Sequence, residues 1–291
     1  MPRLILVVCW GNIHRSVIAE QMILKELRIR GLQNEYRVES RGIQGTPGID
    51  PPEHGNLRGY SAWEPTKNAL DTYGVEIPES KQATPISSEI AEEASLILTM
   101  GSDAHAKLTE EWARFPSLMG KLIPFGEIPD PHGETNEERL QRVVREIQVV
   151  VRTRLDDVLL LVSSISVSKE EVLNFVHDLI EKSVSKSIWL TMRSDDDPLP
   201  DWYFDLLRRK AEEGVKIRRI GFGNASFFET ERRIHIVHPN YSFRFSNSQY
   251  QRMLLVDRSK LLFKTAEGIW YTEDHDAISK YIRYFENNWL E

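Results

Sequence analysis

The sequence predicts an α/β protein of two domains, the first of which is built on a doubly wound parallel sheet. With 291 residues, the chain is longer than one average domain. Near its start, residues 4–8 form a continuous apolar run, which is typical of a strand buried on both faces of a parallel sheet. A loop containing Gly11 and Asn12 follows, and then an amphipathic helix. Strand, tight loop and helix in this order open a doubly wound α/β domain.

The other elements of the first half follow from apolar periodicity and from helix breakers. The first helix carries Ile18, Met22, Ile23 and Leu27 on one face, and Gly31 ends it. The stretch 44–65 is rich in Gly and Pro and is predicted to be a long loop, which in a compact domain is usually functional. Further strands are predicted at 36–40, 94–100 and 122–124, and further helices at 68–73, 105–115 and 137–162.

A boundary between two domains is predicted at 163–168, where small polar residues follow the long helix. Ser168 and Glu171 have the spacing of a capping box, so a new helix is expected to begin there. Beyond it, an α/β pattern continues with strands at 188–192, 215–220, 234–237, 253–256 and 261–264 and helices at 202–213 and 276–289. We therefore expect a first domain at 1–163 and a second α/β domain with a mixed sheet at 166–291.

Composition and charge restrict the class of protein. Hydrophobic residues make up 41% of the chain and aromatic residues 9%, which is enough for ordinary cores and argues against disorder. The 37 Lys and Arg against 44 Asp and Glu give a net charge of -7, which argues against a protein that coats nucleic acid. No apolar run approaches the about 20 residues of a membrane helix, and residues 4–10 lack the length of a secretory signal. A soluble, cytoplasmic protein is therefore expected.

The single cysteine is the most informative residue. Without a second thiol, the chain can form neither an intramolecular disulfide nor a Cys-rich zinc site. Cys9 ends the first predicted strand, and Arg15 begins the first predicted helix. This arrangement directs backbone N–H groups and a helix N-terminus at one point, which creates an anion site and lowers the pKa of a thiol. Cys9 is therefore either a thiolate nucleophile or, in the simpler interpretation, a buried packing residue.

Three further residues supply the groups that phosphoryl transfer needs. The guanidinium of Arg15 can hold two phosphate oxygens at once, and Ser16 can donate a hydrogen bond to a thiolate. Asp130 lies between two prolines, which restrict its backbone in a loop just before the long helix. It is the candidate general acid for the leaving oxygen, and the alternative is that it is only a turn residue.

These residues resemble the low-molecular-weight protein tyrosine phosphatase family over about residues 1–160. The resemblance rests on four blocks in the family's order: Val8-Cys9-x-Gly11-Asn12-x-x-Arg15-Ser16-x-x-Ala19-Glu20, Ser40-x-Gly42, Leu96-Ile97-Leu98-Thr99-Met100 and Asp130-Pro131. It implies a flavodoxin-like fold with a four-stranded parallel sheet. It also implies phosphate-ester hydrolysis through a cysteinyl-phosphate intermediate, without a metal or a cofactor.

The resemblance also implies a role for each site residue. Cys9 is the nucleophile, Arg15 binds the phosphate, and Asp130 is the general acid and base. Asn12 shapes the loop and Ser16 supports the thiolate. The phosphate-binding loop is implied to consist of Trp10, Gly11, Asn12, Ile13, His14 and Arg15.

Trp10, His14, Val17 and His132 depart from the residues that are usual in the family, and these departures concern the substrate more than the phosphate chemistry. His14 stands where a second cysteine is usual, and we expect it to help lower the pKa of the Cys9 thiol. Ile13 is the residue that family members acting on phosphotyrosine commonly carry, so tyrosine is favoured. The rim that contacts the substrate is expected to consist of Trp10, Tyr60, Trp63 and His132.

The second half resembles the phospholipase D superfamily, with lower specificity. Tyr250, Arg252 and Asp257 occupy the His, Lys and Asp positions of its H-x-K-x4-D motif. A tyrosine hydroxyl, with an ordinary pKa of about 10, is a poor substitute for the histidine nucleophile, so a catalytically silent domain is expected. Its arginines could still bind an anion such as a nucleotide, a phospholipid headgroup or a phosphopeptide, or they are ordinary solvated charges. The arginines considered are Arg252, Arg218, Arg219, Arg232, Arg233 and Arg244. By analogy with paired phospholipase D halves, a homodimer is expected.

Three functions remain open at this point. The leading one is a phosphomonoester hydrolase, most simply a protein tyrosine phosphatase, with a C-terminal regulatory or targeting domain. Its partner would be a phosphorylated protein or a small phosphomonoester. The second is a non-catalytic sensor or binding protein for a phosphorylated ligand. The third is an arsenate reductase that depends on an external thiol, because this chain lacks the cysteines of an internal relay.

Overall fold

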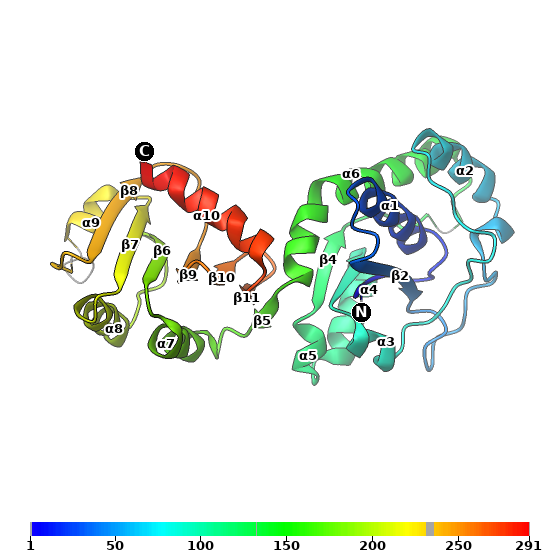
Figure 1. Ribbon diagram of the computed structural model, residues 1–291. Coiled ribbons are helices and arrows are strands. Elements are labelled where there is room, and N and C mark those ends of the chain that lie inside the picture. The colour runs from blue at the N-terminus through cyan, green and yellow to red at the C-terminus, as the bar shows by residue number, and fades with distance from the viewer. Residues whose placement is uncertain (1, 132, 231–235, 291) are drawn as a thin grey trace. The chain divides into compact units, whose positions relative to one another are not determined.

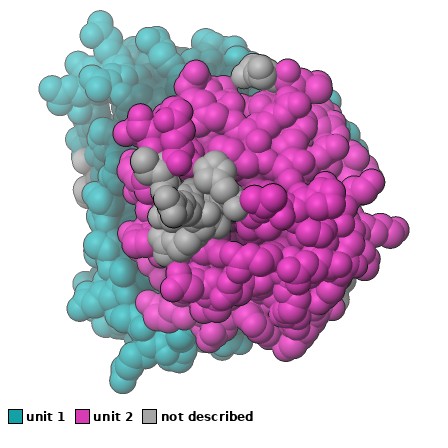
Figure 2. Space-filling view, turned by 90° about the vertical axis from the view of Figure 1, so that its left-hand side faces the viewer, with its two compact units in different colours: residues 1–162 teal, residues 163–291 magenta. Residues whose placement is uncertain are grey.

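The computed structural model describes residues 2–131, 133–230 and 236–290, and it divides the chain into two compact units. Unit 1 comprises Met1–Val162 and unit 2 comprises Ser163–Glu291, coloured teal and magenta in Figure 2. His132 and residues 234–235, the first half of the strand predicted at 234–237, lie outside the described residues. Among the described helices, none is long and apolar enough to cross a membrane.

Unit 1 contains the predicted four-stranded parallel sheet. Its strands are β1 (Arg3–Cys9), β2 (Tyr36–Gly42), β3 (Leu96–Met100) and β4 (Leu122–Gly126), in the order β2-β1-β3-β4. β1 lies between β2 and β3 and is buried from its second residue onward, which explains its continuous apolar sequence. Because the chain crosses from one side of β1 to the other between β2 and β3, the carboxyl end of β1 is the switch point at which ligands bind in such sheets.

Helices cover both faces of this sheet. On one face, Leu4, Leu6 and Val8 of β1 form a core with residues of α3 (Ser88–Glu93), α4 (Ser102–Trp112) and α5 (Pro116–Met119). On the other face lie α1 (Arg15–Ile29) and α6 (Glu137–Val162), and α2 (Trp63–Thr72) contacts α6 (Figure 1).

The helix boundaries correct the sequence prediction in two places. The loop predicted at 44–65 ends at residue 62, because α2 begins at Trp63, and it contains a short 3-10 helix, η1 (Leu57–Gly59). The helix α4 begins three residues before the predicted start, immediately after Gly101, whose φ of 101° interrupts the preceding extended backbone.

Unit 2 is an α/β domain with the predicted mixed sheet. The sheet has the order β5-β11-β10-β9-β6-β7-β8, and β6, β7 and β8 are parallel to one another. The strands are β5 (Ile165–Val167), β6 (Ser187–Arg193), β7 (Lys216–Phe222), β8 (Tyr241–Ser246), β9 (Met253–Val256), β10 (Lys260–Lys264) and β11 (Ile269–Thr272). The helices are α7 (Val172–Ser183), α8 (Asp201–Glu212), α9 (Ala225–Thr230) and α10 (His275–Leu290).

Three strands of unit 2 were not predicted. β5 lies within the segment predicted to be a boundary, and it pairs with β11, which was also missed. Of the strand predicted at 234–237, the described residues Ile236 and Val237 lie outside any strand, and β8 begins at Tyr241. In β8, aromatic residues alternate with serine and arginine. Its hydrophobic pattern is therefore weaker than that of the continuous apolar runs of the buried strands.

The core of unit 2 contains one unusual residue, Arg219 of β7. It is 0% exposed, and no nitrogen of its guanidinium has a hydrogen-bond partner. Its guanidinium carbon lies 5.6 Å from the ring centre of Tyr203 and 5.3 Å from that of Phe204, both on α8. Arg219 was among the arginines considered for anion binding, and its burial among aromatic rings removes it from any surface site.

We expect the substitution Arg219→Met to stabilise unit 2 by about 1–4 kcal/mol. It removes a buried cation that faces only the neutral side chains of Tyr203, Phe204 and Tyr241 among the described residues. The measurement is the urea dependence of hydrogen exchange at the amides of β7. Arg218→Met, at the neighbouring exposed position, is the control and should change little. A loss of protection in Arg219→Met would show that the cation–aromatic contacts outweigh the desolvation cost.

Candidate active site

Cys9 and Arg15 meet at the switch point of the parallel sheet of unit 1. Cys9 is the last residue of β1, and Arg15 is the first residue of α1. The connecting loop packs against the end of β2, where a Cβ at Gly42 would lie 2.9 Å from Cβ of Asn12. Gly42 therefore lets the loop approach the sheet, which gives a physical reason for the glycine in the Ser40-x-Gly42 block.

Asn12 ties this loop to its surroundings. Its φ of 53° is left-handed, a conformation that asparagine tolerates better than most residues. Its Nδ2 donates to Oγ of Ser16 at 3.0 Å and to Oγ of Ser40 at 2.8 Å, and its Oδ1 accepts from the backbone N–H of Thr84 at 2.9 Å. Asn12 is 1% exposed, so each polar atom of its side chain is satisfied within the protein.

The thiol of Cys9 is buried beside a hydroxyl group. Its Sγ lies 3.0 Å from Oγ of Ser16, and the two residues are 2% and 0% exposed. Because Asn12 Nδ2 donates to the same Oγ, the hydroxyl proton of Ser16 is available to the sulfur. This arrangement can stabilise a thiolate.

Arg15 is held by three groups at the carboxyl edge of the sheet. Its side chain is 3% exposed. Nη1 and Nη2 donate to the two carboxylate oxygens of Asp103 at 3.2 Å and 2.9 Å, and Nη1 also donates to the carbonyl oxygen of Ile128 at 3.2 Å. Nη2 further donates to Oδ2 of Asp130 at 2.7 Å. The structure thus brings the predicted Cys9, Arg15 and Asp130 together.

Asp103 was not found from the sequence. It lies in the first turn of α4, directly after β3, and its pair of hydrogen bonds orients the fork of Arg15. The position of an acidic residue just beyond the carboxyl end of a parallel strand was an available signal. Gly101 makes room for this contact, since a Cβ there would collide with Nη1 of Arg15 and Oδ1 of Asp103.

His14 is buried and neutral. Its Nε2 lies 2.9 Å from Oγ1 of Thr66 on α2, and its Nδ1 has no hydrogen-bond partner. Burial, with a smaller contribution from the charge of Arg15, lowers the pKa of His14 from 6.5 to about 3. The expectation that His14 helps to lower the pKa of the Cys9 thiol is therefore wrong: His14 carries no charge near neutral pH and makes its hydrogen bond to Thr66.

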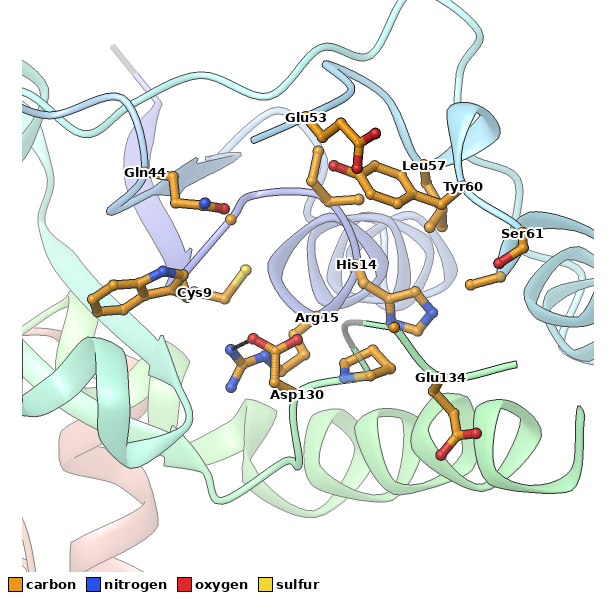
Figure 3. A pocket seen from close by; sticks show the side chains of 16 residues that line it. Cys9, His14, Arg15, Gln44, Glu53, Leu57, Tyr60, Ser61, Asp130 and Glu134 are labelled. Atoms are coloured by element: carbon orange, nitrogen blue, oxygen red, sulfur yellow. Dashed lines mark hydrogen bonds and ion pairs between the residues drawn. The ribbon is translucent and has the colours of Figure 1, made fainter. Parts of the chain in front are cut away.

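A pocket of about 430 Å³ opens above Cys9 and Arg15 (Figure 3). Trp10 and Tyr60, two of the predicted rim residues, line it. Trp63 does not: it lines a separate depression with Arg58, whose guanidinium carbon lies 4.4 Å from the indole centre. The lining residues that the sequence did not indicate are Gln44, Glu53, Leu57, Ser61, Ala62, Pro131, Gly133 and Glu134.

The predicted second-domain site is only partly assembled. Tyr250 donates to Oδ2 of Asp196 at 2.6 Å, and Arg252 lies 3.6 Å from the other oxygen of this carboxylate. Burial and the neighbouring Asp196 raise the pKa of the Tyr250 hydroxyl further above its usual range. Asp257 lies elsewhere: it accepts hydrogen bonds from the backbone N–H groups of residues 185–187. The extended strand β9 lies between Arg252 and Asp257 in the sequence. Because β9 runs antiparallel to β6, Asp257 lies near the start of β6 and Arg252 lies toward its end.

Among the described residues, no cluster of His, Cys, Asp and Glu side chains could hold a metal ion. The groups that are brought together are a buried thiol, a buried guanidinium and a partly exposed carboxylic acid. These are the elements of nucleophilic catalysis on a phosphate ester.

The family model described as low molecular weight phosphotyrosine protein phosphatase matches residues 4–159. The chain belongs to this family, and it is a phosphatase hydrolase. It is 32% identical over 139 residues to the low molecular weight protein-tyrosine-phosphatase Etp of Escherichia coli K12, a match that covers 46% of this chain and 80% of Etp.

Two further proteins are similar to parts of this chain. The probable low molecular weight protein-tyrosine-phosphatase EpsP of Ralstonia solanacearum is 33% identical over 137 residues, which cover 45% of this chain and 80% of EpsP. The crystal structure of a low molecular weight protein tyrosine phosphatase from T. tengcongensis is 20% identical, with a TM-score of 0.43 over 53% of this chain and 99% of that chain.

The buried neutral state of His14 predicts a pH-dependent stability of unit 1. Below pH 6.5 the unfolded chain binds a proton at His14, whereas the folded chain does not do so until about pH 3. The free energy of unfolding should therefore fall as the pH is lowered from 6.5 to 3, by up to about 1.4 kcal/mol per pH unit. The measurement is urea-dependent hydrogen exchange of unit 1 at several pH values. In His14→Gln, the free energy of unfolding should decrease less steeply as the pH is lowered, whereas His177→Gln in unit 2 should keep the original slope.

The space at Gly101 predicts a specific effect on activity. Gly101→Ala should displace the fork of Arg15 from Asp103 and reduce kcat/KM for an aryl phosphate about 10–100-fold. Gly31→Ala is the control, because Gly31 also has a positive φ of 73° but its Cβ would meet no atom within 4 Å. If both substitutions reduced kcat/KM equally, the loss of activity would come from backbone strain and not from displacement of the Arg15 guanidinium.

Proposed function

We propose that unit 1 is a protein tyrosine phosphatase that acts through a cysteinyl-phosphate intermediate. The observation that carries this proposal is the position of Cys9 Sγ, the Arg15 guanidinium and the Asp130 carboxyl around one pocket of about 430 Å³. A nucleophile, a phosphate clamp and an acid are the components that a metal-free phosphate transfer to a thiol requires.

In the first step, the thiolate of Cys9 attacks phosphorus while the bond from phosphorus to the ester oxygen breaks. Arg15 and the backbone N–H groups of the loop 10–15 bind the non-bridging oxygens, on which negative charge is spread. Asp130 transfers its proton to the leaving phenolic oxygen. The products are the free tyrosine and a phosphate bonded to sulfur.

Asp130 must leave Arg15 to act as this acid. In the present structure its Oδ2 accepts from Nη2 of Arg15 at 2.7 Å. A phosphate oxygen that binds Nη2 takes the place of this carboxylate oxygen, while Asp103 continues to hold the fork. Binding of substrate thus frees the Asp130 carboxylate, which takes up a proton from the solvent and delivers it to the leaving oxygen.

In the second step, Asp130 removes a proton from a water molecule, whose oxygen attacks phosphorus. The bond between phosphorus and sulfur breaks, inorganic phosphate leaves, and the Cys9 thiolate is regenerated beside the hydroxyl of Ser16.

The walls of the pocket support an aryl ester. Trp10, Ile13, Leu57 and Tyr60 supply apolar and aromatic surface to the pocket that Cys9 also lines. The Tyr60 hydroxyl accepts from the backbone N–H of His54 at 3.0 Å, which fixes the ring as a wall. The relatives are named as protein-tyrosine-phosphatases, which agrees with this substrate.

For unit 2 we propose a regulatory or targeting role without catalysis, on a degenerate phospholipase D-like fold that can form a homodimer. The tyrosine at position 250 is engaged with Asp196, and its hydroxyl is a weaker acid than usual, so it cannot serve as a nucleophile near neutral pH. Arg218 and Arg244 are the exposed arginines of β7 and β8, and both lie over the ring of Trp289. An anionic ligand could bind them there in addition to these contacts. We expect the protein to act in the cytoplasm.

The test is metal-free hydrolysis of an aryl phosphate by the full chain. Cys9→Ser should abolish turnover, and Asp130→Asn should lower kcat by about 10²–10⁴-fold because protonation of the leaving group is lost. Asp205→Asn, on the surface of unit 2, is the matched control and should have no effect. Binding of vanadate without turnover of any aryl phosphate would instead identify a sensor for phosphorylated ligands.

A further inference from the structure

Carboxylates dominate the charge around the pocket. Among the described residues that line it, Arg15 is the one permanent cation, whereas Glu53, Asp130 and Glu134 are acidic. Arg15 is also bound by two carboxylates, those of Asp103 and Asp130. A phosphate ester that enters this site therefore meets a cation whose charge is already matched.

Two of the lining carboxylates have structural partners. Asp130 is paired with Arg15. Glu134 accepts from the backbone N–H groups of Thr135 and Asn136 at 3.0 Å and 2.8 Å and from Arg139 at 3.1 Å. These bonds place the Glu134 carboxylate ahead of α6, and in Figure 3 it points away from the pocket.

Glu53 differs from both. Its side chain is 78% exposed, and its nearest basic group, Nε2 of His54, is 3.9 Å away. In Figure 3, Glu53 and Tyr60 lie on the side of the pocket opposite Arg15 and Asp130. The ring of His54 packs edge-on against Tyr60 at 4.9 Å, so the backbone next to Glu53 is anchored to the pocket wall.

We propose that Glu53 selects phosphotyrosine segments that carry Lys or Arg next to the phosphotyrosine. This inference rests on the proposed function and names its substrate class. A dianionic phosphate in a site with excess negative charge is stabilised by substrate cations, and an acidic neighbour adds repulsion. The phosphotyrosine ring occupies the pocket between Tyr60 and the thiol, so the residues beside it pass the rim that holds Glu53.

The preference should be moderate and sensitive to salt. An exposed carboxylate that meets one or two substrate cations supports about a three- to tenfold difference in kcat/KM between basic and acidic flanks. Since the Debye length falls from about 10 Å at 0.1 M salt to about 3 Å at 1 M, high salt should largely remove the difference.

The experiment compares three phosphotyrosine peptides that differ only in the flanking residues, which are Lys, Ser or Glu. With the full chain at low salt, we expect kcat/KM to decrease from the Lys to the Ser to the Glu peptide. In Glu53→Gln the ratio between the Lys and Glu peptides should fall toward 1, and in Glu53→Lys it should reverse. Glu79→Gln, an exposed acidic residue that does not line the pocket, should keep the original ratio.

The outcomes separate this inference from the proposed function. Hydrolysis of a small aryl phosphate that depends on Cys9 supports the phosphatase mechanism alone. If the Lys and Glu peptides are then hydrolysed equally well, or if the ratio does not change in the Glu53 variants, the role of Glu53 is overturned. If the Cys9-dependent aryl phosphatase activity is itself absent, the proposed function fails first.

Discussion

The burial of the Arg15 guanidinium is the constraint on which the site depends. Burial of a cation that is 3% exposed costs free energy, which hydrogen-bond acceptors offset. Three segments provide these acceptors: the first turn of α4, the carbonyl of Ile128 and the side chain of Asp130. These segments follow β3 and β4, so the charge of Arg15 connects the carboxyl ends of three parallel strands. The same requirement keeps position 101 free of a side chain.

Buried hydrogen bonds also fix the loop between β1 and α1, which we propose binds phosphate. Asn12 connects it to β2 through Ser40 and to the segment before α3 through Thr84, and His14 connects it to α2 through Thr66. Because both side chains are buried, the loop conformation is set before any ligand binds. In the mechanism that we propose, such a preorganised loop binds the transferred phosphate without reorganisation during the reaction.

The sequence was most informative where a single local pattern carries the structure. The buried strand before Cys9, the glycine and asparagine of the loop and the amphipathic helix after Arg15 are adjacent, so their order alone predicted the geometry of the phosphate-binding loop. β8 and β5 were missed because a short strand with polar residues has no such local signal and is stabilised by pairing with distant strands. Asp257 was grouped with Tyr250 and Arg252 by motif spacing, but an intervening extended strand moves it away from them.

The sequence by itself therefore determined the class of fold of each half and the single thiol, together with Arg15 and Ser16 beside it in the sequence. Only the tertiary structure decided which side chains complete the site. Asp103 reaches Arg15 across 88 residues of sequence, Trp63 turns to Arg58 outside the pocket, and His14 becomes neutral because it is buried. The physical reason is that periodicity and motif spacing describe neighbours along the chain, whereas charge pairing and desolvation depend on neighbours in space.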